Sequence, residues 1–502
     1  MFKNFIGFHL EAERQRVKKQ AHNLARQANL MKLAVAMITG WVLWNLPSAA
    51  FGIEGLTVVE QRVIAVFCYA TLMWVMEPIP SWTTSVSAIV ILLFACSDSS
   101  LWIFSQPYEA EALGTLISYK SLMACFSDPI IMLFIGGFTL AIAATKCGLD
   151  VKLARIMLKP FGTRSENVLL GFLLVTGFFS MFLSNTATAA MMLTFLAPVL
   201  KSLPANGKGR ICLAMAIPIG ANIGGIGTPI GTPPNAIALK FLNDPAGLNL
   251  NIGFGEWMLF MMPFTLVLLF IAWGVLLKMF PFTQKTIELQ IEGETRTGWR
   301  TWVTYATFAA TILLWMFDKV TGVNSNVVAM LPVGVFALTG VLTKRDLEEI
   351  NWSVLWMVAG GFALGLALQS TGLAAHLIAT IPFHTWSPVL MIVGSGLLCY
   401  VMANFISHTA TANLLVPILA LAGASAAATL GEYGGVSTLL IGVAMASSVA
   451  MVLPISTPPN ALAHATGLIE QKQMMRMGLI MGAVGLVLGY AMLITLGKYG
   501  LI

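Results

Sequence analysis

Long apolar stretches separated by short polar segments run through almost the whole chain of 502 residues. Eleven of these stretches are long enough to cross a bilayer, for which a helix needs about 20 predominantly apolar residues. They lie at 31–51, 61–78, 81–97, 122–147, 208–243, 255–279, 300–317, 325–343, 352–372, 434–467 and 476–497. The pattern predicts an all-α polytopic membrane protein.

Two further apolar blocks, at 166–202 and 387–425, each carry a small polar patch near the middle. The patches read LSNTATA from Leu183 and ISHTATA from Ile406. Basic residues collect in short cytoplasmic loops, so their positions show whether such a block crosses the bilayer once or turns back. Reading 166–202 as a single crossing would place the basic residues of one flank outside the cell. We therefore interpret both blocks as re-entrant hairpins.

This count gives eleven transmembrane helices and two re-entrant hairpins, with a cytoplasmic N-terminus and an outer C-terminus. Residues 1–30 are predicted to be a basic cytoplasmic segment, and we expect no cleaved signal there. The segment 98–121 is predicted to be an outer connector with an interfacial helix, and 281–299 a cytoplasmic linker between two halves. Topology thus explains most of the formal net charge of +6.

The two halves repeat three motifs in the same order. The pairs are GGFTLAIAATKCGL at Gly136 with GGFALGLALQSTGL at Gly360, SNTATAAMMLTFLAP at Ser184 with SHTATANLLVPILA at Ser407, and IGTPPNAIALK at Ile230 with ISTPPNALAHA at Ile455. The spacing between the two copies is nearly the same for all three pairs, which indicates a duplication. An odd number of crossings separates equivalent spans, so the halves are predicted to be inverted repeats, as in secondary transporters whose binding site lies between the repeats.

Each hairpin tip must interrupt a helix within the bilayer, and so must GIGTPIGTPPN from Gly225 and PISTPPN from Pro454. Unpaired backbone polar groups are costly in hydrocarbon, so such breaks persist only inside protein or beside a cavity. The N-terminal helix ends attract an anion, whereas the opened carbonyls and the Ser and Asn oxygens suit a small hard cation such as Na⁺. The four breaks are predicted to form one midplane pocket for an oxygen-rich anion and one or more cations.

Composition and the remaining motifs narrow the class of protein. The chain is 57% hydrophobic and 10% charged, so the lipid bilayer must cover much of its surface. His408 takes the place at the second tip that Asn185 holds at the first, and an intramembrane His is a functional candidate by default. The chain carries no hydrolase, metalloprotease or nucleotide-binding motif. We therefore expect neither an enzyme nor a nucleic-acid partner.

These motifs resemble those of the divalent-anion/sodium symporter family of di- and tricarboxylate carriers. FLSNTATA, GTPIGTPPN, HTATANLLVP and STPPN carry the resemblance, which extends over residues 33–496. It implies a homodimer whose protomers each contain a scaffold domain, with the helices of 31–165 and 300–386, and a transport domain that moves as an elevator. The transport domain would comprise 166–280, with hairpin 166–202 and broken helix 208–243, and 387–502, with hairpin 387–425 and broken helix 434–467.

The resemblance also implies which residues bind the substrate and the coupling ion. One substrate carboxylate would be bound at the first tip and the other at the second tip and its Thr-Pro-Pro turn. The substrate-binding set is Asn185, Thr186, His408, Thr409, Thr457 and Pro458. The first Na⁺ site would consist of Ser180, Ser184, Asn185 and the carbonyl of Gly231. All four positions match the family pattern.

The second Na⁺ site departs from the family pattern. Ala403 stands where the symporters usually have Thr, and His408 where they have Asn, so two oxygen ligands are lost. The backbone carbonyls of Ile406 and Ser456 would remain as a degenerate second site. Moving a dianion through a low dielectric unaccompanied is prohibitive, and each Na⁺ supplies one compensating charge. Our hypothesis is that His408 substitutes for the second Na⁺ and reduces the sodium stoichiometry.

We therefore expect a transporter that imports C4-dicarboxylates of the succinate, fumarate and malate class across a bacterial-type inner membrane, with Na⁺ as the coupling ion. A sodium-independent dicarboxylate exchanger of the same family is the alternative, because a His at position 408 also resembles the exchangers. A channel or receptor without coupled transport is disfavoured by the inverted duplication. The motifs do not rank C4-dicarboxylates against citrate, 2-oxoglutarate or sulfate.

Overall fold

The structure is a computed structural model that describes residues 27–106, 108–201, 203–204, 207–245, 247–287, 297–380 and 386–502. Within these residues the chain folds into helices, and β structure is restricted to isolated bridges. The all-α prediction is therefore confirmed for the described chain. Most of the predicted basic segment 1–30 and the centre of the predicted linker 281–299 lie outside the described residues.

The chain divides into two compact units. One comprises the chain up to Met123 together with Gly360–Thr380, and the other comprises Ala124–Ala359 and Ile381–Ile502. Both predicted parts of the transport domain lie in the second unit, and the predicted scaffold helices are divided between the two units. The boundaries of scaffold and transport domain therefore stay a prediction.

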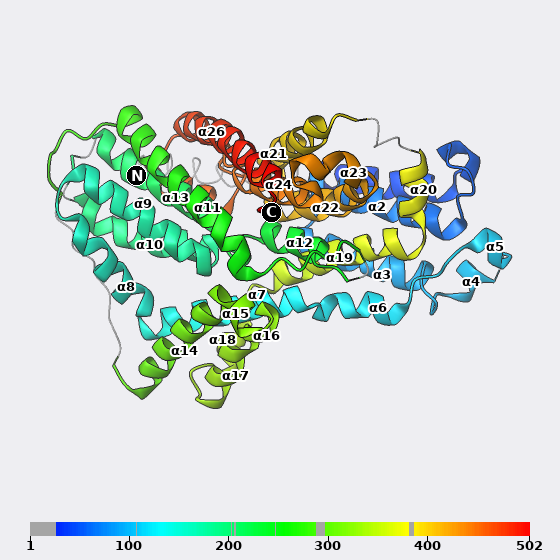
Figure 1. Cartoon of the computed structure of the whole chain (residues 1–502), viewed down its shortest axis with the longest axis horizontal. Helices are drawn as coiled ribbons and strands as arrows, with labels where there is room; N and C mark the ends of the chain where they lie inside the picture. Colours follow the sequence, from blue (N-terminus) through cyan, green and yellow to red (C-terminus); the bar gives the residue numbers. More distant parts are fainter. Residues whose placement is uncertain are drawn as a thin grey trace, which may run out of the picture. The chain divides into compact units, whose positions relative to one another are not determined.

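The first unit contains the N-terminal helices (Figure 1). A helix over residues 27–45 is followed by η1 (Ser48–Phe51), α2 (Val58–Met76), α3 (Ser81–Ala95), α4 (Trp102–Ser105), α5 (Ala110–Leu113), most of α6 (Tyr119–Ala124), the end of α19 (Trp352–Ser370) and α20 (Leu373–Thr380). Thr57 and Glu60 form a capping box that begins α2, because each side chain binds the other residue's backbone N–H. The short helices α4 and α5 lie in the predicted connector 98–121.

The second unit contains the remaining elements. Up to α19 they are η2 (Cys125–Ser127), α7 (Pro129–Cys147), α8 (Leu149–Leu158), η3 (Lys159–Phe161), α9 (Ser165–Phe182), α10 (Asn185–Lys201), α11 (Lys208–Gly225), α12 (Pro233–Leu242), α13 (Phe254–Met279), α14 (Trp299–Met316), α15 (Asp318–Thr321), α16 (Ser325–Val328), α17 (Met330–Leu338) and α18 (Lys344–Glu348). After α20 come η5 (Leu390–Gly394), α21 (Ser395–Phe405), α22 (His408–Ser425), α23 (Ala427–Leu430), η6 (Gly431–Tyr433), α24 (Gly435–Ser448), α25 (Pro458–Ala465) and α26 (Gln471–Lys498).

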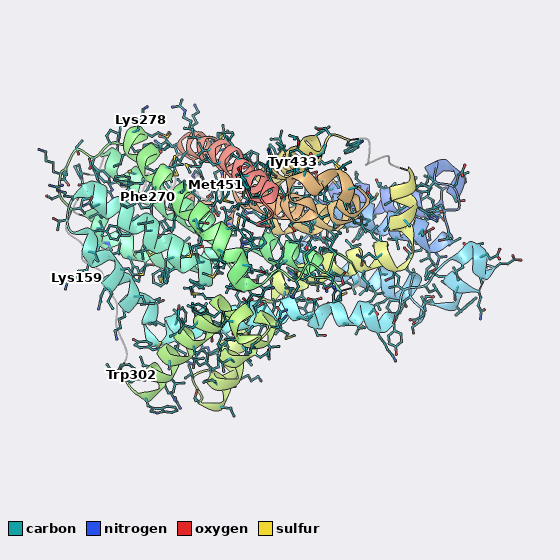
Figure 2. All side chains as sticks on the ribbon, viewed as in Figure 1. Lys159, Phe270, Lys278, Trp302, Tyr433 and Met451 are labelled. Atoms are coloured by element: carbon teal, nitrogen blue, oxygen red, sulfur yellow. The ribbon has the colours of Figure 1, made fainter. Side chains whose placement is uncertain are left out.

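Seven helices among the described residues are long and apolar enough to cross a bilayer. They are α2, the segment Tyr119–Cys147 that ends with α7, and α9, α13, α19, α22 and α26. Exposed apolar side chains such as Phe270 on α13 and Trp302 on α14, both labelled in Figure 2, suit contact with lipid. The chain is a multi-pass membrane protein, and the count of eleven crossings stays a prediction.

The structure interrupts its helices at the four polar motifs. The chain leaves the helix between α9 and α10 and between α21 and α22, at the two predicted tips. It does so again between α11 and α12 and between α24 and α25, where prolines begin the second helix of each pair. Within the predicted span 122–147, α7 begins anew at Pro129, because the Asp128 side chain accepts the N–H of Ile130 and a proline suits the first position of a helix.

The helices around these breaks pack closely. A Cβ atom at Gly224 on α11 would collide with the backbone of Gly177 on α9, so only glycine allows this approach. The short helix α12 contacts α22 and α24, and the short helix α25 contacts α10 and α11. Each short helix that follows a Thr-Pro-Pro turn therefore packs against helices of the other half of the sequence.

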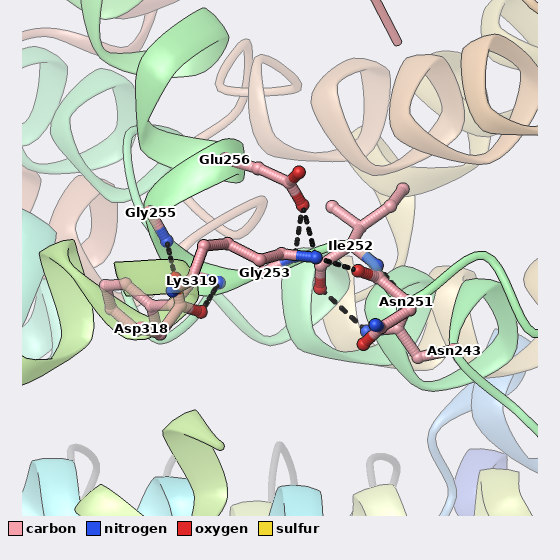
Figure 3. A network of polar contacts seen from close by, with 9 residues as sticks. Asn243, Asn251, Ile252, Gly253, Gly255, Glu256, Asp318 and Lys319 are labelled. Carbon is pink, nitrogen blue, oxygen red and sulfur yellow. Dashed lines mark hydrogen bonds and ion pairs between the residues drawn. The ribbon is translucent and has the colours of Figure 1, made fainter. Parts of the chain in front are cut away.

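A polar network holds the start of α13 (Figure 3). The carboxylate of Asp318 accepts hydrogen bonds from the backbone N–H groups of Phe254, at 2.6 Å, and Gly255, at 3.4 Å. These groups have no partner within the helix, and a carboxylate also suits the positive end of the helix dipole. Lys319 forms an ion pair with Glu256 at 3.3 Å. The network thereby fixes α13 to the turn between α14 and α16.

Candidate substrate and cation site

In the first half, two acceptor oxygens lie within hydrogen-bond distance of the same hydroxyl group, that of Ser180. Ser180 Oγ lies 2.5 Å from Asn185 Oδ1 and 2.7 Å from the carbonyl oxygen of Ala221. A hydroxyl can donate to only one acceptor at a time, so at least one of these close oxygen pairs lacks a proton. Ser180 is fully buried near the end of α9, and Asn185 begins α10. Such a group of neutral oxygens suits a small hard cation.

The Gly-rich turn after α11 brings Gly231 to the same place. A Cβ atom at Gly225 would lie 2.8 Å from Asn185 Oδ1 and 2.9 Å from the carbonyl oxygen of Gly231. The structure therefore brings together Ser180, Asn185 and Gly231, three of the residues predicted for the first Na⁺ site. The fourth, Ser184, caps α10, because its Oγ accepts the N–H of Ala187 at 3.1 Å.

Asn235 closes the turn between α11 and α12. Its Nδ2 donates to the carbonyl oxygens of Gly225 at 3.0 Å, Ile226 at 3.2 Å and Thr228 at 2.8 Å. Thr228 Oγ1 in turn donates to the carbonyl of Met181 next to the first tip. The break thus satisfies its carbonyl groups with side chains, as a buried interruption of a helix requires.

Asn460 performs the same task in the second half. Its Nδ2 donates to the carbonyl oxygens of Met451 at 2.9 Å and Leu453 at 3.0 Å. Met451 is equivalent to Ile226, and Leu453 to Thr228, because each pair has the same sequence spacing as Asn460 and Asn235. The hydrogen-bond pattern is therefore repeated in register between the two broken helices. Met451 is labelled in Figure 2.

The second tip is built differently from the first. His408 Nε2 lies 2.7 Å from the carbonyl oxygen of Ala450, which can only accept, so Nε2 carries a proton and donates. Ser447 Oγ donates to the carbonyl of His408 at 3.1 Å, and Ser407 caps α22 by accepting the N–H of Ala410. An imidazole N–H donor thus lies where the first tip presents the amide of Asn185.

The predicted degenerate second cation site lies around Asn404. Ser456 Oγ donates to the carbonyl oxygen of Asn404 at 2.8 Å, and Asn404 Oδ1 accepts the N–H of Val452 at 2.9 Å. Ile406 is buried and adopts an extended conformation directly after α21, and Ala403 offers no side-chain oxygen. The side chains here hold the turn between α24 and α25 together.

The comparison with known proteins decides the family. A family model described as the sodium:sulfate symporter transmembrane region matches residues 27–501. The chain belongs to this family. An uncharacterized transporter of Haemophilus influenzae is 33% identical over 399 residues, or 75% of this chain and 83% of the relative. The sodium-dependent dicarboxylate transporter SdcS of Staphylococcus aureus is 29% identical over 506 residues, or 92% of each chain. The resemblance to the divalent-anion/sodium symporters is thereby confirmed.

A solved membrane transporter shares the fold of this symporter-family chain. The YdaH transporter of Alcanivorax borkumensis, whose crystal structure reveals an unusual topology, superimposes with a TM-score of 0.53. The match covers 76% of this chain and 88% of that chain at 12% sequence identity. At this identity the likeness concerns the fold alone.

In this chain, the buried side-chain amide of Asn222 joins the two halves of the sequence. Asn222 Nδ2 on α11 donates to Thr457 Oγ1 at 3.1 Å and to Asn460 Oδ1 at 3.0 Å. Thr457 Oγ1 also accepts the N–H of Asn460 at 3.2 Å and so caps α25. The predicted substrate-binding residue Thr457 is therefore held by α11, the helix whose Ala221 carbonyl lies beside Ser180 of the predicted first Na⁺ site.

The remaining predicted substrate residues differ in exposure. Asn185 and His408 are half-buried at their tips, Thr186 is exposed after the first tip, and Thr409 is buried after the second. Pro458 is exposed at the first position of α25. Three helices begin at these residues, namely α10 at Asn185, α22 at His408 and α25 at Pro458, and their N-terminal ends carry partial positive charge.

The chemistry of the first cluster fits Na⁺ better than a divalent metal. Between Ser180 and Asn235 the sequence contains no Asp, Glu or His. Among the described residues, no group of three or more His, Cys, Asp or Glu side chains could hold a metal ion. Neutral hydroxyl, amide and carbonyl oxygens are the ligands that sodium-coupled transporters of other folds use for their coupling ion.

Sequence reasoning missed three of the asparagines that organise the site. Asn235 and Asn460 end the repeated TPPN motif, so the repeat itself carried a signal that the fourth residue matters as much as the prolines. Asn222 carries no such signal, because a single Asn in an apolar helix does not reveal its partner. Its role became visible only when the contact with Thr457 was known.

Proposed function

We propose that this transporter imports C4-dicarboxylates of the succinate, fumarate and malate class, with Na⁺ as the coupling ion. The observation that carries the proposal is the cluster of Ser180, Asn185 and Ala221 oxygens at the first tip, in a chain whose relative SdcS is a sodium-dependent dicarboxylate transporter. Na⁺ would be carried as a co-substrate by Ser180, Ser184, Asn185 and the carbonyl of Gly231. It would offset one charge of the dianion, which cannot cross a low dielectric alone.

The proposed substrate site lies at the helix ends. Asn185 and Thr186 would bind one carboxylate, and Thr409 and Thr457 the other, with Pro458 shaping the second turn. Short uncharged donors suit this task, because they orient a carboxylate without holding it as tightly as a buried Arg would. The N-terminal ends of α10, α12, α22 and α25 add positive potential.

His408 is proposed to replace the second cation. Its Nε2–H already donates to the carbonyl of Ala450, an oxygen that would otherwise be open toward a positive charge. The backbone carbonyls of Ile406 and Ser456 are the oxygens left for a degenerate second cation site. On this proposal fewer Na⁺ ions accompany each dicarboxylate than in a symporter with two complete sites.

The proposed mechanism is an elevator within a homodimer in the cytoplasmic membrane, with the N-terminus inside and the C-terminus outside. The repeated hydrogen-bond pattern of Asn235 and Asn460 supports the duplication, and such a carrier is built from two copies in inverted orientation. Two ion pairs join predicted scaffold to predicted transport segments. They are Asp128 with Lys240 at 2.8 Å and Lys319 with Glu256 at 3.3 Å, and both would have to separate during the movement.

Reconstituted proteoliposomes test the proposal. Empty vesicles should accumulate labelled succinate only when a Na⁺ gradient is directed inward, and external citrate or sulfate should be compared as competitors. Uptake that needs internal succinate and ignores Na⁺ would establish the exchanger, the second candidate, because a His at position 408 also resembles the exchangers. Flux that does not saturate would instead indicate a channel.

A further inference from the structure

We propose that Asn222 is a positioning residue that makes Thr457 a hydrogen-bond donor toward the substrate and couples this donor to the cation cluster of the first half. Asn222 lies one turn before the end of α11 and is 1% exposed. The inference deepens the proposed function and rests on it. It assigns a specific task to a residue that touches neither the proposed cation nor the proposed dicarboxylate.

The argument begins with the lone pairs of one hydroxyl group. Thr457 Oγ1 accepts a hydrogen bond from Asn222 Nδ2 at 3.1 Å and another from the backbone N–H of Asn460 at 3.2 Å. A hydroxyl has two acceptor lone pairs and one donor proton. With both lone pairs used, the proton of Thr457 must point away from both donors. The hydroxyl is thereby fixed as a donor, which is the role that a carboxylate ligand requires.

The same turn of α11 also contacts the cation cluster. The carbonyl oxygen of Ala221, the residue before Asn222, lies 2.7 Å from Ser180 Oγ. Ser180 Oγ is 2.5 Å from Asn185 Oδ1 at the first tip. Two adjacent residues of one helix therefore face two sites, the backbone of Ala221 toward the proposed Na⁺ ligands and the side chain of Asn222 toward Thr457.

This arrangement gives a physical path for coupling. α11 ends at an interruption whose carbonyl groups are bound by side chains, and a cation among the oxygens of Ser180 and Asn185 would restrict the motion of this end. A substrate that then binds Thr457 would meet a hydroxyl already held in the donor orientation. Each ligand would therefore raise the affinity for the other by the same factor, typically about 5- to 150-fold for coupled sites.

Asn413 provides a matched control for a purely structural role. It is also a fully buried asparagine in the second unit, and its Nδ2 donates to the carbonyl of Met357 at 2.9 Å. The side-chain oxygens of both Asn222 and Asn413 have no hydrogen-bond partner among the described residues. Replacing either removes a buried amide, but only Asn222 connects to Thr457.

The experiment measures the KM for succinate at low and high external Na⁺ in proteoliposomes. In the wild type the KM should fall at least about fivefold as Na⁺ is raised. In Asn222→Ala the KM should rise about tenfold at high Na⁺ and lose most of this dependence, whereas Asn413→Ala should keep the wild-type ratio. Asn222→Asp should be worse than Asn222→Ala, because a carboxylate only accepts and would turn the O–H of Thr457 toward itself and away from the substrate.

A double mutant shows whether Asn222 acts through the hydroxyl. In a Thr457→Val background, Asn222→Ala should add less than about a twofold change in KM, because residues that act through one contact are not additive. Additive effects, or a Na⁺ dependence in Asn222→Ala equal to that of Asn413→Ala, would overturn the inference. If Asn222→Ala does not fold, Asn222→Ser compared with Asn413→Ser decides in the same way. A wild type indifferent to Na⁺ would overturn the proposed function itself, and with it this inference, before any variant is made.

Discussion

The two broken-helix regions share one backbone design and differ in the chemistry of their tips. Asn235 and Asn460 close the two turns through carbonyl groups at equivalent positions. At the first tip, Asn185 presents an amide oxygen to a shared hydroxyl proton. At the second, His408 presents an N–H donor to the carbonyl of Ala450. The first tip therefore has acceptors in excess, and the second has a donor in place.

This difference indicates which features an interrupted membrane helix must keep. The backbone of the break has to be satisfied internally in both halves, because no water is available in hydrocarbon to do so. The side chain at the tip does not have to satisfy the backbone, so its residue type can differ according to the ligand that it binds. We infer that the two halves of this transporter share the substrate but contribute unequally to cation binding.

The largest expected effect is the loss of Asn185. Asn185→Ala removes both a proposed carboxylate donor and a proposed cation ligand, so Na⁺-driven succinate uptake should fall to background. The measurement is initial uptake into proteoliposomes, with matched protein content and a monodisperse elution profile as evidence of folding. Near-normal uptake would show that the cluster around Ser180 is not the transport site.

The next effect contrasts equivalent positions of the two halves. A Cβ atom at Gly225 would lie 2.8 Å from Asn185 Oδ1 and 2.9 Å from the Gly231 carbonyl, so Gly225→Ala must displace the tip or the turn. Displacements of about 1 Å can cost about 100-fold in rate, and we expect uptake to fall about tenfold or more. Ala450, the equivalent position in the second half, already carries a Cβ atom.

Ala450→Gly is therefore the matched control for Gly225→Ala. It removes one buried methyl group, which is worth about 1 kcal/mol, and leaves the carbonyl that His408 binds. Uptake should remain within twofold of the wild type. If Gly225→Ala and Ala450→Gly reduced uptake equally, the space around the two equivalent positions would not differ in the way that the structure indicates.

The positions of these breaks could be predicted because they follow from covalent chemistry. Pro233 and Pro458 each follow a Thr in an extended conformation and cannot donate a backbone hydrogen bond, so they favour the first position of a new helix. The polar patches in LSNTATA and ISHTATA likewise mark the points where the chain turns. The same motifs predicted the family, because their order and composition are specific to it.

The partners of the buried amides could not be predicted. Asn222 and Thr457 are 235 residues apart, and hydrophobic periodicity gives no information on which polar groups meet across helices. The start of α7 inside the span 122–147 was not predicted for a different reason, since Asp128, a good helix cap, and Pro129 stand within an apolar run that still reads as one span. When membrane spans are predicted from the length of an apolar run, a single helix cap followed by a proline does not change the prediction.

A smaller, thermodynamic effect tests whether Asn235 and Asn460 perform the same task. Replacing either by Ala leaves buried carbonyls without a donor, which should lower the free energy of unfolding by about 1–3 kcal/mol. Replacing either by Asp should lower it further, because a carboxylate can only accept and would face carbonyl oxygens. Thermal unfolding in detergent measures both. An Asp variant as stable as the wild type in one half alone would show that the backbone design is not shared.

The smallest expected change tests the contrast between the tips directly. His408→Asn together with Ala403→Thr restores two side-chain oxygens to the second half and removes the donor that binds the Ala450 carbonyl. The Hill coefficient for Na⁺ should then rise from about 1 toward about 2, because a second cation could bind near Asn404, with little change in maximal uptake. The measurement is the Na⁺ dependence of succinate uptake at saturating substrate. The single substitution Ala403→Thr is the control, since it adds an oxygen while the His408 donor stays in place. If the coefficient rises equally in the control, the imidazole does not occupy the place of a cation, and the two tips differ in composition without differing in ion use.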